Sequence, residues 1–191
     1  KNKISMPDIK IILDKIKETD KGEKIIIAVD GRAASGKTTL ANALKDAVGA
    51  SVVHTDHFFL PLNLRTKERL DTAGGNFHYE RFKTEVLPYI RKNKDFSYRT
   101  FSCKKMDFDA FAYVKNSHIL IVEGSYSCHN VLGKYYDFSV FLDVDKKEQI
   151  NRIVLRNGKD KAKIFAERWI VMEEKYFSAQ KTAENADIVM K

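Results

Sequence analysis

Two glycines separated by four residues precede a lysine and a threonine at positions 31–38. Glycine permits backbone angles that turn successive N–H groups to one side, and the N-terminus of a following helix adds partial positive charge. These groups can hold the phosphates of a nucleotide, with Lys37 reaching the β- and γ-phosphates and the Thr38 hydroxyl holding Mg²⁺. The predicted nucleotide-binding residues are Gly31, Ala33, Ala34, Ser35, Gly36, Lys37, Thr38 and Thr39.

The flanking sequence supports this interpretation. Residues 25–29 form an apolar run typical of a buried strand, and residues 38–48 repeat apolar side chains at helical spacing. The alternative is an ordinary glycine turn with a surface lysine. Average residue frequencies make a chance coincidence of the four specified positions an event of about 1 % in a chain of this length. We therefore predict a phosphate-binding loop at a strand-to-helix turn.

Apolar, β-branched runs recur along the chain and alternate with helical patterns, which predicts a parallel sheet covered by helices on both faces. Residues 96–114 alternate aromatic and polar side chains, as in a β-hairpin inserted near the mouth of the site. The predicted fold class is α/β, a P-loop NTPase fold with a five-stranded parallel sheet, this hairpin (96–115) and a basic lid. The predicted strands are residues 25–29, 51–54, 119–122, 139–142 and 188–190, and the helices are residues 38–48, 79–92, 147–156 and 164–183.

A phosphate-binding loop is shared by GTPases, motors and small-molecule kinases. Residues 71–74 spell the Asp-x-x-Gly segment with which GTPases meet the γ-phosphate, but residues 63–70 before it are polar and basic instead of a buried strand. The Asn-Lys-x-Asp segment that recognises guanine does not occur, and residues 157–160 have its letters in the wrong order. These features argue against a GTPase.

A kinase needs a carboxylate that takes the proton of the acceptor hydroxyl. Asp56 follows the second predicted strand, at the edge where ligands of open α/β sheets bind, and we predict that it is this base and lies near the metal. Glu123 ends the third predicted strand at the same edge, where a carboxylate can hold Mg²⁺. The alternatives are a turn cap for Asp56 and an exposed strand-end charge for Glu123.

Basic residues gather in and after the helix predicted at residues 147–156. Arg152 and Arg156 are four residues apart, so they share a helical face and can converge on one ligand. A lid at residues 152–168 would close over ATP and neutralise charge on the transferring phosphoryl group, with Lys37 and both arginines in catalytic roles. A solvated basic face is the alternative.

The composition is globular, with 43 % hydrophobic and 31 % charged residues among 191, which suits one domain over residues 1–191. No apolar stretch approaches the roughly 20 residues of a membrane span, and residues 1–20 predict an amphipathic helix instead of a secretory signal. Cys103 and Cys128 form no disulfide framework or metal-ligand spacing, so we predict a cytoplasmic protein. The chain is compatible with a homo-oligomer, but its sequence does not determine the number of copies.

The net charge of +8 suits either nucleic acid or a polyanionic nucleotide such as ATP. The basic residues are spread along the chain, without a long arm or an aromatic-basic RNA-binding signature. Nucleic acid is therefore not predicted to be the main partner.

Together these segments resemble the uridine kinase family, within a wider group that includes phosphoribulokinase and bacterial pantothenate kinase. The resemblance implies that Asp56 is the base, that Thr38 and Glu123 serve Mg²⁺, and that Arg152 and Arg156 belong to the lid. It also implies substrate contacts at Phe59, His78, Tyr98, Cys103 and Arg168, although core packing is the alternative for Phe59 and Tyr98. The similarity covers residues 24–190, with matches at residues 31–38, 55–59, 74–77, 80–82, 119–124, 141–156, 167–169 and 176–177.

Two positions depart from the pattern of this family on the acceptor side. His78 stands where typical uridine kinases carry an aspartate for the ribose hydroxyls, and Cys103 stands where they carry a histidine for the pyrimidine edge. Gln149 and Ile153 also replace arginines that are common in the lid. A polar pocket rejects ligands that leave its groups unpaired, so these differences could retune or abolish nucleoside recognition.

Three hypotheses follow. The first is a kinase that uses ATP and Mg²⁺ to phosphorylate a small-molecule acceptor, a pyrimidine nucleoside, at the 5′-hydroxyl of uridine or cytidine. The second keeps this machinery with another acceptor, such as a sugar or a pantothenate-like or vitamin-like alcohol. The third is a regulatory or nucleic-acid-associated protein that binds a nucleotide without a productive acceptor. The sequence does not distinguish ATP from GTP as the donor.

Overall fold

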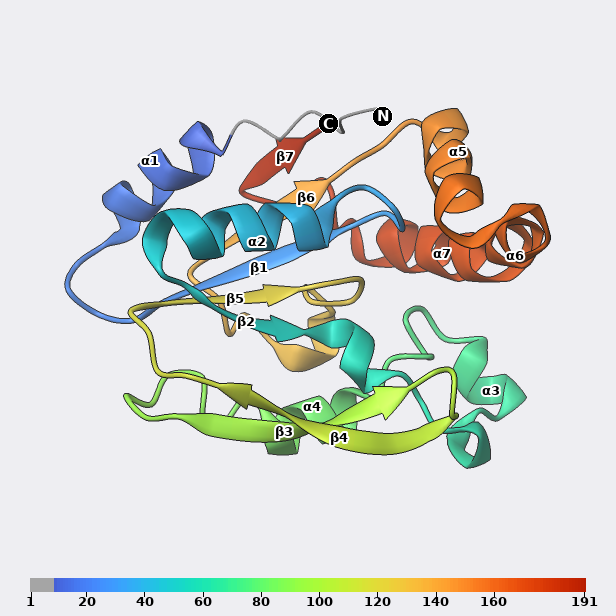
Figure 1. Ribbon diagram of the computed structural model, residues 1–191, viewed down its shortest axis with the longest axis horizontal. Helices are drawn as coiled ribbons and strands as arrows, with labels where there is room; N and C mark the ends of the chain where they lie inside the picture. The colour runs from blue at the N-terminus through green and yellow to red at the C-terminus, as the bar shows by residue number, and fades with distance from the viewer. Residues whose placement is uncertain (1–8) are drawn as a thin grey trace.

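Five strands form one parallel sheet in the order β2-β5-β1-β6-β7 (Figure 1). The computed structural model describes residues 9–191, apart from the side chain of Lys161. Every residue of β1, β5 and β6 is buried, because these strands are covered on both faces. The predicted α/β fold with five parallel strands is confirmed. The strands are β1 Ile25–Gly31, β2 Ser51–His54, β5 Ile119–Glu123, β6 Phe138–Leu142 and β7 Ile188–Met190.

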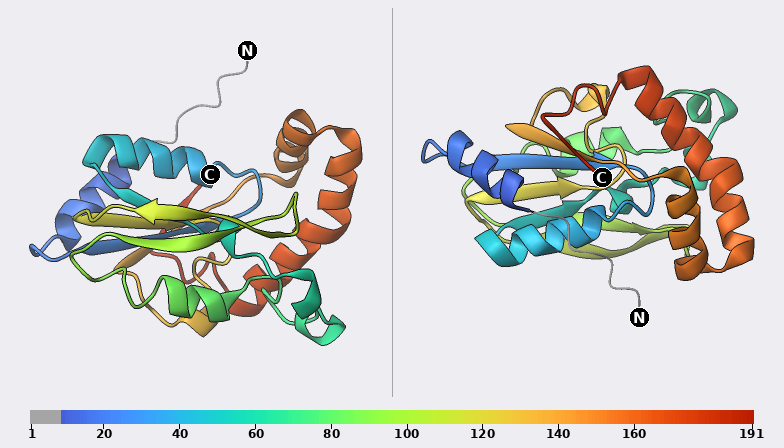
Figure 2. Two further views of the ribbon diagram at one scale, coloured as in Figure 1. Left: turned by 60° about the horizontal axis from the view of Figure 1, so that its bottom comes forward. Right: turned by 90° about the horizontal axis from the view of Figure 1, so that it is seen from above.

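Helices cover both faces of the sheet (Figure 2). On one face, α1 (Lys10–Thr19) and α2 (Lys37–Val48) bury apolar side chains such as Ile12 and Leu40 against the strands. On the other face, α4 (Tyr79–Glu85) and α7 (Ile170–Gln180) contribute Phe82 and Tyr176 to a second core. The start of the helix predicted over residues 1–20 lies outside the described residues.

Two predicted helices have different bounds in the structure. The helix predicted at residues 79–92 ends at Glu85 and continues as turns, because Pro88 lacks an N–H and its ring disfavours helical geometry in the residue before it. The long helix predicted at residues 164–183 begins earlier, as α6 (Lys159–Ile164), and passes through a π-helical turn (Phe165–Trp169) into α7. Gly158, at φ 84°, separates α6 from α5 (Lys146–Asn157).

The predicted hairpin consists of the antiparallel strands β3 (Phe96–Ser102) and β4 (Asp107–Val114), which form a separate sheet. It packs on the 3₁₀ turn Thr55–Phe58 that follows β2, with the rings of Tyr98 and Phe58 5.1 Å apart. The hairpin therefore supports the turn that carries Asp56. A short helix, α3 (Lys67–Leu70), lies in the connection that leads to α4. Within residues 9–191, no helix is long and apolar enough to cross a membrane.

Candidate active site

The loop between β1 and α2 has the backbone geometry of an anion cradle. Gly31 and Gly36 have φ angles of 141° and 102°, which L-residues rarely adopt. A Cβ atom at Gly31 would lie 2.2 Å from the carbonyl oxygen of Leu142 on β6, so the close packing of this turn requires glycine. Lys37 Nζ donates to the carbonyl oxygens of Gly31 and Arg32 at 2.8 Å each. The first N–H groups of α2 have no intrahelical acceptor and can bind phosphate.

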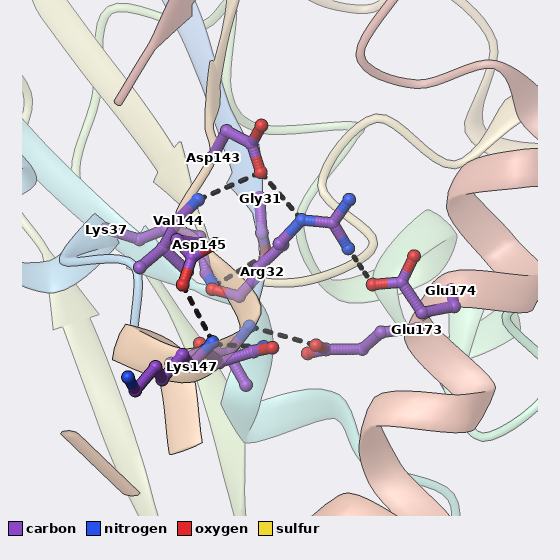
Figure 3. A network of polar contacts seen from close by, with 11 residues as sticks. Gly31, Arg32, Lys37, Asp143, Val144, Asp145, Lys147, Glu173 and Glu174 are labelled. Atoms are coloured by element: carbon purple, nitrogen blue, oxygen red, sulfur yellow. Dashed lines mark hydrogen bonds and ion pairs between the residues drawn. The ribbon is translucent and has the colours of Figure 1, made fainter. Parts of the chain in front are cut away.

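Side chains of α7 and of Asp143, the residue after β6, hold the start of this loop (Figure 3). The guanidinium of Arg32 lies between Asp143, whose Oδ1 is 2.7 Å from Arg32 Nε, and the carboxylate of Glu174. The next residue, Ala33, donates its N–H to Glu173 Oε2 at 2.9 Å. The phosphate loop is therefore tied to α7, the helix that follows the predicted lid.

The helix α5 also contacts the loop. Asp145 precedes it and caps it by accepting the N–H of Lys147 at 2.9 Å. Further along α5, Gln149 Nε2 donates to the carbonyl of Ala33 at 3.1 Å, and Arg152 Nη1 donates to that of Ala34 at 3.3 Å. The helices α5 and α7 therefore hold the carbonyl groups of Ala33 and Ala34 and the N–H of Ala33.

A cavity of about 1260 Å³ joins the phosphate loop, the ends of β2 and β5, and the lid helices. Of the site residues predicted from sequence, Gly31, Ser35, His78, Tyr98 and Arg168 are not among its lining residues. The predicted residues that line it are Ala33, Ala34, Gly36, Lys37, Thr38, Thr39, Asp56, Phe59, Cys103, Glu123, Arg152 and Arg156.

Glu123 stands at the end of β5, directly beside the phosphate loop. The Thr38 hydroxyl lies 3.3 and 3.4 Å from its two carboxylate oxygens, and His54 Nδ1 lies 2.5 Å from Oε1. In the part of the chain that the structure describes, no group of three or more His, Cys, Asp or Glu side chains could hold a metal alone. Mg²⁺ needs few protein ligands, because water and phosphate oxygens complete its shell. Thr38 and Glu123 supply hard oxygen donors of that kind.

Asp56 lies in the turn after β2 and opens to the cavity. The hydroxyl of Thr55 donates to the carbonyl of Ser125 at 2.9 Å, which ties this turn to the segment after β5 and so places Asp56 near Glu123. Desolvation by the surrounding protein raises the pKa of Asp56, and the charge of Glu123 acts in the same direction. The positive charges of Lys37 and Arg156 oppose this shift, so both lie within electrostatic reach of the carboxylate.

A sequence model of a protein family matches residues 26–191 and therefore spans the phosphate loop, the hairpin and the lid; the family is that of phosphoribulokinase and uridine kinase. The chain belongs to the phosphoribulokinase/uridine kinase family. This membership places it among the P-loop kinases, which are phosphotransferases. Among proteins of curated function, none matches the sequence.

Two solved structures share the fold of this family member. One is described as a possible uridine kinase from Bacillus stearothermophilus and aligns with a TM-score of 0.73 at 18 % identity, over 96 % of this chain and 97 % of that chain. The other, from Silicibacter sp. TM1040, carries the provisional description of a fructose transport system kinase. It aligns with a TM-score of 0.73 at 22 % identity, over 95 % of this chain and 98 % of that chain. At these identities the likeness concerns the fold alone.

The residues that the family resemblance places on the acceptor side are dispersed in the structure. Phe59 and Cys103 line the cavity. Tyr98 belongs to β3 of the hairpin and is buried, and its hydroxyl accepts the backbone N–H of His54 at 3.2 Å. Burial raises the pKa of Tyr98 to about 12. His78 precedes α4, and Arg168 is exposed with its guanidinium 5.1 Å from the ring of Trp169. Tyr98 therefore occupies a position in the hydrophobic core, in agreement with the alternative of core packing.

Sequence reasoning did not single out several residues that the structure brings to the site. Asp30, at the end of β1, is fully buried and accepts hydrogen bonds from the Cys128 N–H at 3.0 Å and the Tyr176 hydroxyl at 2.8 Å. Its pKa is raised to about 6 because burial disfavours the charged form. The sequence feature that could have identified Asp30 is that it is the only charged residue in the apolar strand β1. Asp30 does not line the cavity, but residues that do and are absent from the predicted set include Asn76, Ser125, Tyr126, Trp169 and Glu173.

Proposed function

We propose that this kinase transfers the γ-phosphoryl group of ATP to a hydroxyl group of a small molecule. The observation that carries the proposal is that Asp56 and Lys37 line one cavity. A phosphate loop on one wall and a carboxylate open to the same space are what an in-line transfer to a hydroxyl requires.

Asp56 acts as the general base. Its carboxylate takes the proton of the acceptor hydroxyl while the acceptor oxygen forms a bond to the γ-phosphorus and the bond to the ADP oxygen breaks. Lys37 and the N-terminal N–H groups of α2 stabilise the charge on the phosphates. Arg152 and Arg156 extend from α5 into the cavity, where they neutralise further charge and help to exclude water.

Thr38 and Glu123 would hold Mg²⁺, and Asp56 lines the same cavity as a further candidate ligand. Bound Mg²⁺ would supply positive charge that offsets the charge of the transferring phosphoryl group. Both residues supply hard oxygen donors, as Mg²⁺ requires. The hydroxyl of Thr38, in the first turn of α2, lies within 3.4 Å of both carboxylate oxygens of Glu123, at the end of β5.

A pyrimidine nucleoside, phosphorylated at its 5′-hydroxyl, is the first acceptor to test, because the family resemblance favours it. A second candidate is another hydroxylated small molecule, such as a sugar. One observation favours the second: His78 and Tyr98, for which the family resemblance implies contacts to a nucleoside, are not among the residues that line the cavity. We also propose a reducing, cytoplasmic location, which agrees with the free thiols of Cys103 and Cys128.

The test is acceptor-stimulated release of ADP from ATP with a panel of nucleosides and other alcohols. We expect this stimulation to disappear in Asp56→Asn, although that variant should still bind the nucleotide. The control is Asp46→Asn, at an exposed position of α2, which should keep its activity. Stimulation by non-nucleoside alcohols alone would select the second acceptor class. No stimulation, together with strongly salt-dependent RNA binding, would support a regulatory protein instead. Full turnover by Asp56→Asn would show that Asp56 is not the base.

A further inference from the structure

Three polar side chains on one part of the cavity wall have no role in the phosphoryl transfer described above. Asn76 precedes α4, Tyr126 follows β5, and Glu173 lies on α7. All three line the cavity, and their exposed fractions are 1 %, 2 % and 7 %. Two contacts hold them close together: Glu173 accepts the hydroxyl of Ser125, the residue before Tyr126, and Phe77, the residue after Asn76, stacks on the Tyr126 ring.

Asn76 has an unused hydrogen-bonding atom. Its buried Oδ1 has no hydrogen-bond partner. The backbone carbonyl of Asn76 accepts the N–H of Leu60 at 2.9 Å, so this loop is held in place. An unpaired buried amide oxygen costs free energy, and native proteins keep few such groups. A ligand that donates a hydrogen bond would satisfy it.

Glu173 carries a carboxylate with spare acceptor capacity. One oxygen accepts the N–H of Ala33 and the other accepts the hydroxyl of Ser125 at 2.6 Å, and both donors are neutral. A carboxylate has about four lone-pair sites, so about two remain. Neighbouring hydroxyl groups of one ligand can occupy both.

The backbone holds Tyr126 in a conformation that is unusual for a large residue. Its φ angle is 76°, and its N–H donates to Asp30 Oδ1 at 3.3 Å, while Asp30 Oδ2 accepts the N–H of Cys128. The ring stacks on Phe77 at 5.9 Å between centroids. Burial raises the pKa of Tyr126, so its hydroxyl stays protonated. Strain of this kind persists where the surroundings enforce it, often at ligand sites.

We infer that Asn76, Tyr126 and Glu173 form a hydroxyl-binding subsite for the acceptor, which selects a molecule with neighbouring free hydroxyl groups besides the one phosphorylated. Asn76 Oδ1 and Glu173 accept hydrogen bonds from these hydroxyls. Phe59 and Trp169, whose ring centroids are 6.4 Å apart, both line the same cavity and can pack against the carbon skeleton. The subsite supplies the carboxylate that is missing at His78, and the inference rests on the proposed kinase function.

The experiment compares acceptors that differ by one hydroxyl group: D-ribose with 2-deoxy-D-ribose, and uridine with 2′-deoxyuridine. In any pair that the protein phosphorylates, we expect kcat/KM at saturating ATP to be about tenfold or more higher for the compound with the additional hydroxyl group. The deoxy compound leaves buried hydrogen-bond acceptors unpaired. Asn76→Leu and Glu173→Gln should reduce this preference to about twofold or less. The KM for ATP should stay within about twofold in Asn76→Leu, which also shows that the variant folds.

The matched controls are Asn63→Leu and Glu184→Gln, both at exposed positions, and they should keep the wild-type preference. Binding of the same compounds to Asp56→Asn saturated with ADP, measured by saturation-transfer NMR, gives a readout that does not need turnover. Equal use of both members of a pair, an unchanged preference in Asn76→Leu and Glu173→Gln, or no binding of any hydroxylated compound would overturn the subsite. Hydroxylated compounds that bind through Asn76 but are turned over independently of Asp56 would refute the proposed catalytic base and leave the subsite standing.

Discussion

His54 Nδ1 lies 2.5 Å from Glu123 Oε1, at a point where the two residues are paired in the register of β2 and β5. The same carboxylate contacts the Thr38 hydroxyl, so an imidazole on one side and the phosphate loop on the other orient it. Groups that hydrogen-bond to a metal ligand fix its direction and commonly tune metal affinity. His54 is thus a candidate positioning residue for the proposed Mg²⁺ site.

We predict that His54→Ala raises the Mg²⁺ concentration for half-maximal turnover by about tenfold or more, because Glu123 loses the group that orients it. The measurement is an Mg²⁺ titration of ADP release at fixed ATP. His118→Ala, a half-exposed histidine that contacts Asp20 instead, is the control. An unchanged Mg²⁺ requirement in His54→Ala would mean that the contact is only structural.

The raised pKa of Asp56 predicts that activity is lost on the acid side at a higher pH than an ordinary aspartate would give, because the base must be ionised. Arg156 lowers this pKa, so Arg156→Gln should raise it and move the acid limb of kcat/KM to higher pH. The measurement is a pH profile of kcat/KM. Lys45→Gln, an exposed position near the end of α2, should leave the limb in place. A shift of the limb to lower pH in Arg156→Gln would contradict the assignment.

We predict that Gly31→Ala destabilises the protein far more than Gly22→Ala. Both glycines have positive φ angles, so each alanine carries a conformational cost of about 1–3 kcal/mol. At Gly22 nothing lies within 4 Å of the added Cβ, whereas at Gly31 it meets backbone atoms of Leu142. Overpacking adds roughly 1–3 kcal/mol and displaces the loop, so nucleotide affinity should also fall. Urea unfolding and nucleotide binding measure the two effects, and equal losses in the two variants would contradict the argument.

The buried carboxyl of Asp30 predicts a pH-dependent stability. Its folded pKa of about 6 lies above the ordinary aspartate value of 3.8, so between these values the folded state binds more protons than the unfolded state. This contribution to stability is therefore fully present below the unfolded pKa and is lost as pH rises through about 6. Carboxyl ¹³C NMR of the folded protein should show a midpoint near 6 that is absent in Asp30→Asn. A midpoint near 4 would mean that the hydrogen bonds to Asp30 outweigh its burial.

Local patterns in the sequence were sufficient for the sheet and the phosphate loop. The strands β1, β5 and β6 are buried along their whole length, and such strands give continuous β-branched runs that stand out against helical periodicity. The glycines at 31 and 36 are required by backbone angles, which a short motif records directly. Because parallel strands end at one edge of the sheet, the positions of Asp56 and Glu123 in the sequence are enough to predict that both lie near the loop. Their catalytic and metal-binding roles remain predictions.

Only the tertiary structure decided which acceptor-side residues reach the cavity. Tyr98 is buried in the core and His78 stays outside the lining, whereas Asn76 and Glu173 enter it from a loop and from α7. A π-helical turn shifts the helical phase before α7 and carries Trp169, which lines the cavity, and no periodic pattern predicts such a turn. The sequence by itself thus determined the strands, the loop and the edge at which phosphate binds, because these depend on backbone conformation and short-range spacing. The direction in which side chains such as Asn76 and Glu173 point depends on packing between segments that are far apart in the chain. The spacing of residues in the sequence does not encode this packing.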